Sequence, residues 1–169
     1  LKPIISTSWD QERVTPYSYY VQIADNTIDV SLAVSHQSAI YDFEFSNPDQ
    51  PATVILCSDN GKMNAQGSHA EGYQQLSSSM RIFFSGEFSV KPIECGVLRD
   101  GDIQSGQARA EGRQASVAFR FPAGTRKVSL RYGISLIGET QASHNLAREQ
   151  KGFNRLAVEK KGRKVWNET

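Results

Sequence analysis

Residues 128–153 read VSLRYGISLIGETQASHNLAREQKGF, and the spacing of their apolar residues changes partway along. The first part has the two-residue period of a half-buried β-strand, which places on one face Val128, Leu130, Tyr132, Ile134 and Leu136. From Glu139 the spacing is helical, with Ala142 and Leu146 about one turn apart and no proline to interrupt it. We therefore predict that a β-rich chain ends in helices that begin at residue 139.

The residues before 128 form short apolar runs separated by turns. TIDVSLAV (27–34) and IYDFEF (40–45) alternate strictly, whereas ATVILC (52–57) is a continuous apolar run that Asp59-Asn60-Gly61 should close as a turn. The turns recur at about the 8–12-residue spacing of antiparallel sandwiches. No helix lies between the runs, as a parallel sheet would require. We predict an all-β, antiparallel β-sandwich domain over residues 1–138 and a helical linker over residues 139–169.

The same alternation predicts which side chains form the core of the sandwich. These are the apolar residues on the inward face of each run: Ile28, Val30, Leu32, Tyr41, Phe43, Phe45, Val54, Leu56, Phe83, Val117, Phe119, Leu130 and Tyr132.

Composition places the chain among soluble globular proteins. Its 169 residues suit one domain, with 38% hydrophobic and 22% charged residues. No apolar run approaches the roughly 20 residues of a membrane span, so no span is predicted. The first residues include no initiator Met and do not resemble a signal peptide, so the sequence is expected to begin inside a longer chain.

Positive charge gathers at the C-terminal end. Residues 147–169 hold seven Lys/Arg and three Asp/Glu, a net charge of +4, while the other residues carry a net −3. A basic tail can bind nucleic acid, but here the bases surround a helix, alternate with acids and lack aromatic partners for stacking. We predict a solvated helix face and no nucleic-acid binding.

No catalytic or metal-binding arrangement is visible. Asp100-x-Asp102-x-Gln104 with Glu111 resembles a calcium loop, but Ser105 stands where the sharp turn needs Gly, so we expect a polar hairpin. The three histidines, His36, His69 and His144, are too far apart for a metal site and are expected to be surface or structural residues. Cys57 and Cys95 are expected to be buried free thiols, although the sequence leaves a disulfide open.

A family resemblance is carried mainly by the stretch that opens with residue 128. It contains a strand ending in Gly-Ile-Ser, a helix with Ala-x-x-Asn-Leu, and a second helix led by Phe and closed by Trp-Asn: Gly133, Ile134, Ser135, Ala142, Asn145, Leu146, Phe153, Trp166 and Asn167. Two earlier stretches agree in order, through Pro16, Tyr19, Tyr20, Leu32 and Ala33, and through Gly72, Tyr73, Phe83, Phe84, Glu87, Phe88, Ser89 and Pro92. Together they resemble the N-terminal domain of glycoside hydrolase family 92, the calcium-dependent, inverting, exo-acting α-mannosidases.

The sequence departs from the family pattern in three places. Ser18 stands where the family has Gly before its paired tyrosines, and residues 36–39 replace an Arg-Val-Gly stretch. Residues 77–79, all Ser, stand where an aromatic residue commonly follows the Gly-Tyr strand.

The resemblance implies a galactose-mutarotase-like supersandwich followed by linker helices and an (α/α)₆ barrel. In such enzymes the barrel supplies the catalytic acid, the base and the calcium ligands, and the active site lies where the two domains meet. This chain would then be the non-catalytic domain of an extracytoplasmic (periplasmic or secreted) α-1,2-mannosidase that cleaves terminal α-mannosides of glycans. Its partner would be its own barrel, it would itself contribute no catalytic residue and no metal ligand, and its candidate substrate contacts are Tyr73 and Gln74.

Two other readings stay open. The chain could be an autonomous carbohydrate-binding or adhesin-like sandwich, which would need a row of exposed aromatics drawn from Tyr17, Tyr19 and Tyr73, or a structural domain without sugar contact. The tail separates these readings, because only a linker has reason to carry an apolar stripe. Phe153, Leu156 and Ala157 form one at helical spacing. We expect four apolar tail residues to fold back on the sandwich or pair with a second copy: Phe153, Leu156, Val165 and Trp166.

Overall fold

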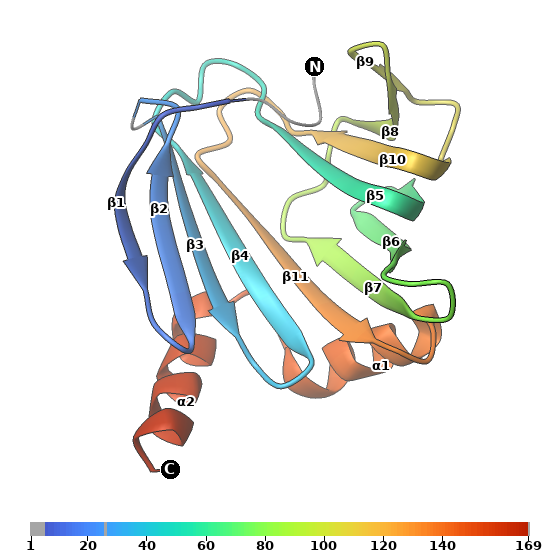
Figure 1. Cartoon of the computed structure of the whole chain (residues 1–169). Helices are drawn as coiled ribbons and strands as arrows, with labels where there is room; N and C mark the ends of the chain where they lie inside the picture. Colours follow the sequence, from blue (N-terminus) through green and yellow to red (C-terminus); the bar gives the residue numbers. More distant parts are fainter. Residues whose placement is uncertain (1–5, 26, 169) are drawn as a thin grey trace.

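The computed structural model describes residues 6–25 and 27–168, and in these ranges the chain forms eleven strands followed by two helices (Figure 1). The strands are β1 (Trp9–Val14), β2 (Ser18–Ile23), β3 (Ile28–Val34), β4 (Ser38–Phe45), β5 (Thr53–Gln66), β6 (His69–Gln75), β7 (Arg81–Phe88), β8 (Glu94–Arg99), β9 (Asp102–Gln104), β10 (Arg109–Arg120) and β11 (Lys127–Ser135). The helices are α1 (Glu139–Glu149) and α2 (Arg155–Asn167). The change from strand to helix falls where the spacing of residues 128–153 predicts it.

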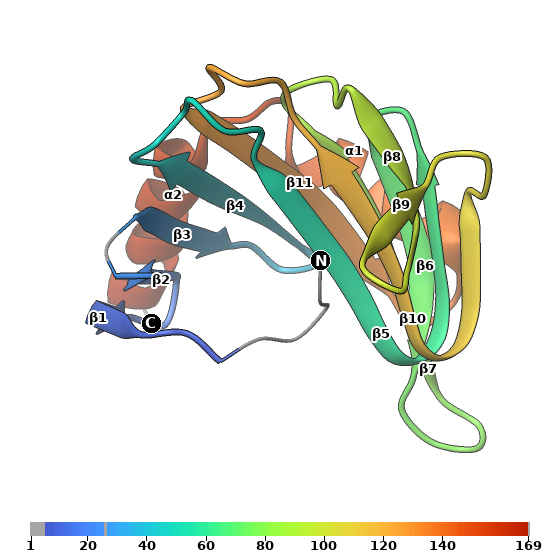
Figure 2. The same ribbon diagram turned by 90° about the horizontal axis from the view of Figure 1, so that it is seen from above.

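The strands pair antiparallel in one sheet of order β1-β2-β3-β4-β11-β7-β6-β5-β10-β8-β9. This sheet curls strongly, and the view from above shows β5 and β10 across the interior from β4 and β11 (Figure 2). The rings of Phe88 on β7 and Phe119 on β10 are 4.7 Å apart between centroids, although β6 and β5 lie between these strands in the sheet. The predicted antiparallel sandwich is therefore confirmed, with both layers formed by one continuous sheet.

The register of β3, β4 and β11 confirms the phase of the predicted alternation. Val30 lies opposite Phe43, and Tyr41 lies opposite both Leu32 and Leu130. Residues that lie opposite one another on neighbouring strands share a face of the sheet. The predicted apolar rows of these strands therefore all face the concave side.

Burial on this concave side is uneven. Among the predicted core residues, Val54, Val117, Phe119 and Leu130 are buried. The others are only half-buried: Ile28, Val30, Leu32, Tyr41, Phe43, Phe45, Leu56, Phe83 and Tyr132. Full burial is reached where the sheet curls over itself, so the densest part of the core lies between β7, β10 and β11 rather than over β3 and β4.

The prediction that Phe83 faces the core is wrong. Ile134 pairs with Phe84 and Leu130 with Phe88, so β7 turns Phe84 and Phe88 inward and Phe83 to the opposite face. Alternation alone could not choose between two adjacent phenylalanines. The register with β11, whose paired residues are 42 or more positions away along the chain, makes the choice.

The turn predicted at Asp59-Asn60-Gly61 is also wrong, because β5 runs through it as one long strand. Its partner β10 continues alongside, with Gly61 opposite Gly112. The paired strands β5 and β10 bend next to Gly61 and Gly112, where Gln114 takes φ 53° and Gly112 takes φ 104°. A Cβ on Gly61 would lie 1.9 Å from Tyr73 O, so this glycine is required by the close approach of β6 rather than by a turn.

Helix α1 packs on the outer face of β11. Its buried residues are Ala142, Asn145 and Leu146, and Asn145 Nδ2 donates a hydrogen bond to Ile134 O at 2.8 Å. Gly133 of β11 lies directly beneath the helix. The Ala-x-x-Asn-Leu segment thus serves to join helix to sheet. In the part of the chain described here, neither helix is long and apolar enough to cross a membrane.

The C-terminal end of α1 binds the turn between β3 and β4 through Glu149. Gln37 N (3.0 Å) and Ser38 Oγ (2.8 Å) both donate hydrogen bonds to Glu149 Oε2. Burial raises the pKa of Glu149, but the hydrogen bonds from Gln37 and Ser38 outweigh it, so the pKa lies below its ordinary value.

This lowered pKa predicts a pH-dependent contribution to stability. A carboxyl whose pKa is lowered by folding stabilises fully above its unfolded pKa, about 4.3, and loses that contribution as pH falls through the lower folded pKa. We expect Glu149→Gln to lower the free energy of unfolding at neutral pH. The difference in this free energy between the variant and the unmodified protein should disappear as pH falls below about 4. Denaturant unfolding of both proteins between neutral and acidic pH measures this difference. A difference that stays constant with pH would contradict the prediction.

Helix α2 lies against β3 and β4 and is held mainly by polar contacts. Asp42, which is buried, accepts a hydrogen bond from Ser129 Oγ (2.6 Å) and pairs with Lys127 Nζ (2.8 Å) and Arg155 Nε (3.3 Å). Ser18 Oγ donates to Glu159 Oε1 at 3.3 Å. The helix is therefore attached through its charged face.

The apolar residues of the tail are divided between packed and exposed positions. Phe153 packs on the sheet, with Arg131 Cζ 4.8 Å from its ring centroid. Leu156 and Trp166 are 66% and 58% exposed. Of the four apolar tail residues, Phe153 thus folds back on the sandwich, whereas Leu156, Val165 and Trp166 are half or more exposed, and their pairing with a second copy stays a prediction.

Candidate functional site

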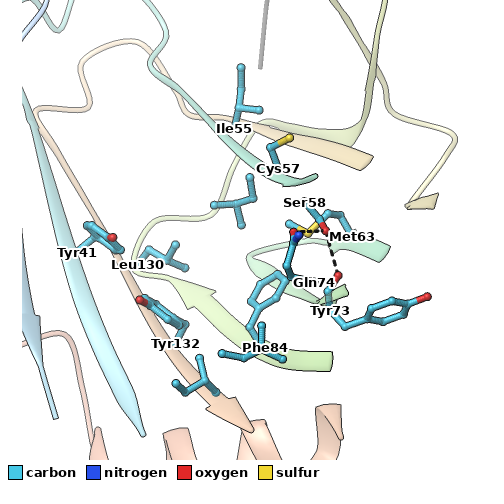
Figure 3. A pocket seen from close by; sticks show the side chains of 13 residues that line it. Tyr41, Ile55, Cys57, Ser58, Met63, Tyr73, Gln74, Phe84, Leu130 and Tyr132 are labelled. Atoms are coloured by element: carbon cyan, nitrogen blue, oxygen red, sulfur yellow. Dashed lines mark hydrogen bonds between the residues drawn. The ribbon is translucent and has the colours of Figure 1, made fainter. Parts of the chain in front are cut away.

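The two candidate substrate contacts, Tyr73 and Gln74, point to opposite faces of β6, because successive residues of a strand alternate. Gln74 Oε1 accepts hydrogen bonds from Ser58 Oγ (2.8 Å) and Asp59 N (2.9 Å), which hold the bend of β5. Gln74 also lines an apolar cavity of about 300 Å³ on the concave side of the sheet, together with Leu56 and Leu130. Figure 3 shows the Tyr73 ring directed away from this cavity. The structure therefore separates the two residues, and a site built on Tyr73 draws on other neighbours.

Tyr73 lies in a group of side chains on the face of the sheet that carries α1. Its ring lies 5.8 Å from that of Phe83, centroid to centroid, and at 58° to it. Two cations lie over the ring, with Arg81 Cζ at 4.5 Å and Lys62 Nζ at 5.9 Å from its centroid. We call these four residues and Glu111, whose Oε1 accepts a hydrogen bond from Tyr73 Oη at 3.4 Å, the Tyr73 cluster.

Two carboxylates beside this cluster, Glu111 and Glu139, are paired with cations. Arg109 donates to Glu111 at 2.5 Å, and this hydrogen bond lowers the pKa of Glu111 from its ordinary value. Glu139, at the start of α1, pairs with Lys62 Nζ at 2.5 Å. Glycoside hydrolysis by two carboxyl groups needs one that holds its proton at working pH. Glu111 is ionised there, so the Tyr73 cluster can bind and orient but cannot supply this proton from Glu111.

An open polar hollow adjoins the Tyr73 cluster at the turn between β6 and β7. It measures about 440 Å³ and is lined by Asn60, Gln75, Leu76, Ser77, Ser78 and Arg81. Arg81 belongs to both sites, since its Nε donates to Gln75 Oε1 at 2.7 Å while its guanidinium covers Tyr73. Amides, hydroxyls and a guanidinium beside an aromatic ring offer both donors and acceptors to a neutral, hydroxyl-rich ligand.

Two exposed apolar residues lie at the same end of the sheet. The sequence predicts Leu136 on the inner face of a strand, but β11 ends at Ser135, and Leu136 and Ile137 are 65% and 83% exposed. Ser135 pairs with Phe83, which in turn pairs with Tyr73. The pair Leu136–Ile137, which we call the apolar rim, therefore lies close to the Tyr73 cluster. Sequence reasoning missed it because the strand period continues past the point where pairing stops.

No grouping of three or more His, Cys, Asp or Glu that could hold a metal occurs in residues 6–25 and 27–168. The loop that resembles a calcium site is split, since Asp102 lies in β9 and Glu111 in β10. The residues described here therefore do not fit a calcium ion, and no step of a reaction is assigned to one within them. His36, His69 and His144 are all exposed, in line with the reading as surface residues.

Both cysteines are free thiols. Cys95 is half-buried, but Cys57 is exposed, which corrects the expectation that both are buried. The two lie on strands β8 and β5, on either side of β10, with Cys57 opposite Ser116 and Cys95 opposite Phe119. Ser116 and Phe119 are three residues apart on one strand and so face opposite ways, which directs the two thiols apart.

The aromatic row needed by an autonomous sugar-binding sandwich is not formed by Tyr17, Tyr19 and Tyr73. Tyr17 lies under α2, where its Cβ would be 2.7 Å from a Cβ on Gly162. Tyr19 belongs to β2, and Oη of its phenol donates to Glu12 Oε1 at 2.8 Å. Between β2 and β6 lie β3, β4, β11 and β7, so Tyr73 has neither of the other two tyrosines as a neighbour.

Comparison with solved structures shows the same fold in larger proteins. A family GH92 inverting mannosidase from Bacteroides thetaiotaomicron superimposes with a TM-score of 0.81 at 22% identity, over 94% of this chain and 22% of that one. A GH92 α-mannosidase of the same species gives 0.80 at 20% identity, over 96% and 24%. A further GH92 glycosyl hydrolase gives 0.81 at 15% identity, over 96% and 25%. The chain thus spans about a quarter of the length of these proteins.

Sequence comparison identifies the family directly. No curated protein matches the sequence. The family profile described as "Glycosyl hydrolase family 92 N-terminal domain" matches residues 4–135, which is most of the chain. The chain belongs to the N-terminal domain family of glycosyl hydrolase family 92.

Proposed function

We propose that this chain is the non-catalytic N-terminal domain of an α-1,2-mannosidase that cleaves terminal α-mannosides of glycans. It helps to shape the active site where it meets a helical catalytic domain of the same polypeptide. The observation that carries the proposal is the placement of the Tyr73 cluster and its polar hollow beside the apolar rim, all at one end of the sheet.

This end of the sheet combines the two features that a shared active site requires. The exposed Leu136 and Ile137 offer apolar surface for contact with a second domain. Tyr73 offers a ring edge and a hydroxyl, and Gln75 and Arg81 offer further hydrogen-bonding groups, to a sugar. Since a sugar carries many hydroxyls and no charge, such groups can orient it without supplying the proton for cleavage.

The chemistry itself is assigned to residues outside this chain. In the proposal the catalytic domain supplies the acid and the base for an inverting reaction and binds the calcium. The enzyme acts outside the cytoplasm, where terminal mannosides of glycans are exposed. These assignments rest on membership of the family and on the pairing of Glu111 and Glu139 with cations.

The first test is activity. Residues 1–169 alone are expected to release no product from an aryl α-mannoside, with or without calcium, whereas the complete polypeptide encoded by the gene should do so. In that polypeptide, Tyr73→Ala should lower kcat/KM about tenfold or more, since losing the contact of this side chain with the sugar and its support of Arg81 is worth about 1–2 kcal/mol. Initial rates against substrate concentration give this value.

Tyr19→Ala is the matched control, because it also removes a half-buried tyrosine but from β2, far from the rim. It should leave kcat/KM unchanged. Turnover by residues 1–169 that is lost on substitution of one of their own acids would overturn the proposal. Equal effects of Tyr19→Ala and Tyr73→Ala on kcat/KM would show that the Tyr73 cluster does not contribute to the active site.

A further inference from the structure

Strand β5 has an open edge in the middle of the sheet. Its second half pairs with β10 on one side and β6 on the other, but the pairing with β6 begins only at Gly61. Over residues 53–58 it pairs with β10 alone. Among the described residues, no strand lies against the other side of this half of β5.

The direction of the peptide groups along this edge follows from one hydrogen bond. Phe121 N donates to Ala52 O at 2.8 Å, so Ala52 directs its carbonyl at β10. In an antiparallel ladder every second residue exchanges hydrogen bonds with the same partner strand. Val54 and Leu56 therefore bond to β10, and the N–H and C=O groups of Thr53, Ile55 and Cys57 point to the open side.

The open edge borders an apolar cavity of about 300 Å³ (Figure 3). Its walls come from β4, β5, β6, β7 and β11, and they include Ile55, Leu56, Phe84, Leu130 and Tyr132. Burial raises the pKa of Tyr132 to about 12, so its phenol stays protonated and this wall carries no charge. Ordinarily a sheet edge is covered, charged or very short, because an exposed apolar edge pairs with other chains.

We propose that the edge formed by Thr53, Ile55 and Cys57 accepts an additional β-strand, supplied by a segment of the same polypeptide that lies outside residues 1–169. The strand pairs antiparallel or parallel with β5 and places alternate apolar side chains in the cavity between Leu56 and Leu130. Main-chain hydrogen bonds hold it, and the cavity selects its side chains, as in other strand-addition sites. The proposal rests on the proposed function, in which this chain is one domain of a longer enzyme.

The length of the related proteins favours an occupant from the same polypeptide. The solved family members are about four times as long as this chain, which covers 22–25% of them. The half-buried state of Leu56, Phe84 and Tyr132 fits a face that is completed by apolar side chains from elsewhere. A neutral cavity wall excludes a charged occupant, because a charge buried without a partner is strongly unfavourable.

Cys57 gives a probe of the edge, since its thiol is exposed and free and its main-chain N–H and C=O point to the open side. Alkylation by N-ethylmaleimide, read on the Cys57 peptide by mass spectrometry, compares residues 1–169 with the complete polypeptide. Cys57 should react several-fold more slowly in the complete polypeptide, because a side chain of the added strand lies about 5 Å from that of Cys57 and hinders the approach of the reagent to its sulfur. The exchange of the Ile55 and Cys57 amide hydrogens should slow in parallel.

Two proline substitutions, at Ile55 and at Leu56, test which N–H groups of β5 point to the open side. Ile55→Pro removes an N–H that points to the open side, so in residues 1–169 it should unfold at the same temperature as Ile55→Ala. In the complete polypeptide Ile55→Pro should unfold at a clearly lower temperature than Ile55→Ala. Leu56→Pro removes an N–H that bonds to β10 and should lower the unfolding temperature in both forms.

The outcomes separate this inference from the proposed function. A complete polypeptide that cleaves mannosides while Cys57 reacts as fast as in residues 1–169 overturns strand addition and leaves the function standing. Protection of Cys57 in a complete polypeptide with no mannosidase activity overturns the proposed function and leaves strand addition standing. Protection of Cys57 in residues 1–169 alone, together with a dimer in size-exclusion chromatography, would assign the edge to a second copy and overturn the inference.

Discussion

Phe119→Ala should lower the free energy of unfolding by about 3–5 kcal/mol, the usual range for a phenylalanine truncated in a closed core. Phe119 is fully buried on β10, and its ring packs 4.7 Å from that of Phe88 across the curl of the sheet. The substitution therefore removes apolar area from the densest part of the core and leaves a cavity. Denaturant unfolding of both proteins gives the difference.

Phe43→Ala is the matched control, because Phe43 has the same side chain and faces the same side of the sheet but is only half-buried. Its loss should be about 1–2 kcal/mol, in proportion to the smaller area that is removed from water. A loss below about 1 kcal/mol for Phe119→Ala, or equal losses for both, would show that the core is not concentrated between β7, β10 and β11.

Gly133→Ala should lower the free energy of unfolding by about 3 kcal/mol or more, because the added methyl group has no room under α1. A Cβ at this position would lie 2.3 Å from Ala142 O and 2.7 Å from Leu146 N. Both are backbone atoms of the helix, so α1 must move away from β11. We expect the hydrogen bond from Asn145 to Ile134 O to break and the amides of α1 to exchange faster.

Gly152→Ala is the control for this substitution, since a Cβ there would meet no atom within 4 Å. Its effect on the free energy of unfolding should stay within about 0.5 kcal/mol. Equal stability of the Gly133→Ala and Gly152→Ala proteins, with α1 amides protected as before, would contradict the packing of α1 on Gly133.

The strands and helices follow largely from local periodicity. The two-residue alternation of residues 27–34 and 40–45 predicts β3 and β4 with the correct inward face, as the pairs Val30–Phe43 and Leu32–Tyr41 show. The change to helical spacing after residue 138 predicts α1. These features could be read from the sequence because side chains a few residues apart must share one face of an element if that face is to be buried.

The candidate site could not be read in the same way. Tyr73 and Gln74 are adjacent in sequence but serve opposite faces of β6, and the neighbours of Tyr73 come from β5, β7 and β10. Arg81 and Lys62 carry no local signal that would mark them as partners of an aromatic ring. The apolar rim was likewise hidden, because Leu136 continues the strand period beyond the last paired residue of β11.

What the sequence alone determined is the type and order of the elements: antiparallel strands first, helices last, and the inward face wherever alternation is strict. Only the tertiary structure decided the inward choice of Phe84 over Phe83, the passage of β5 through Asp59-Asn60-Gly61, and the open edge of β5. The physical reason is that these three depend on which strands pair and how far the sheet bends. Pairing between strands such as β7 and β11 or β5 and β10 joins residues tens of positions apart, so no local pattern can encode it by itself.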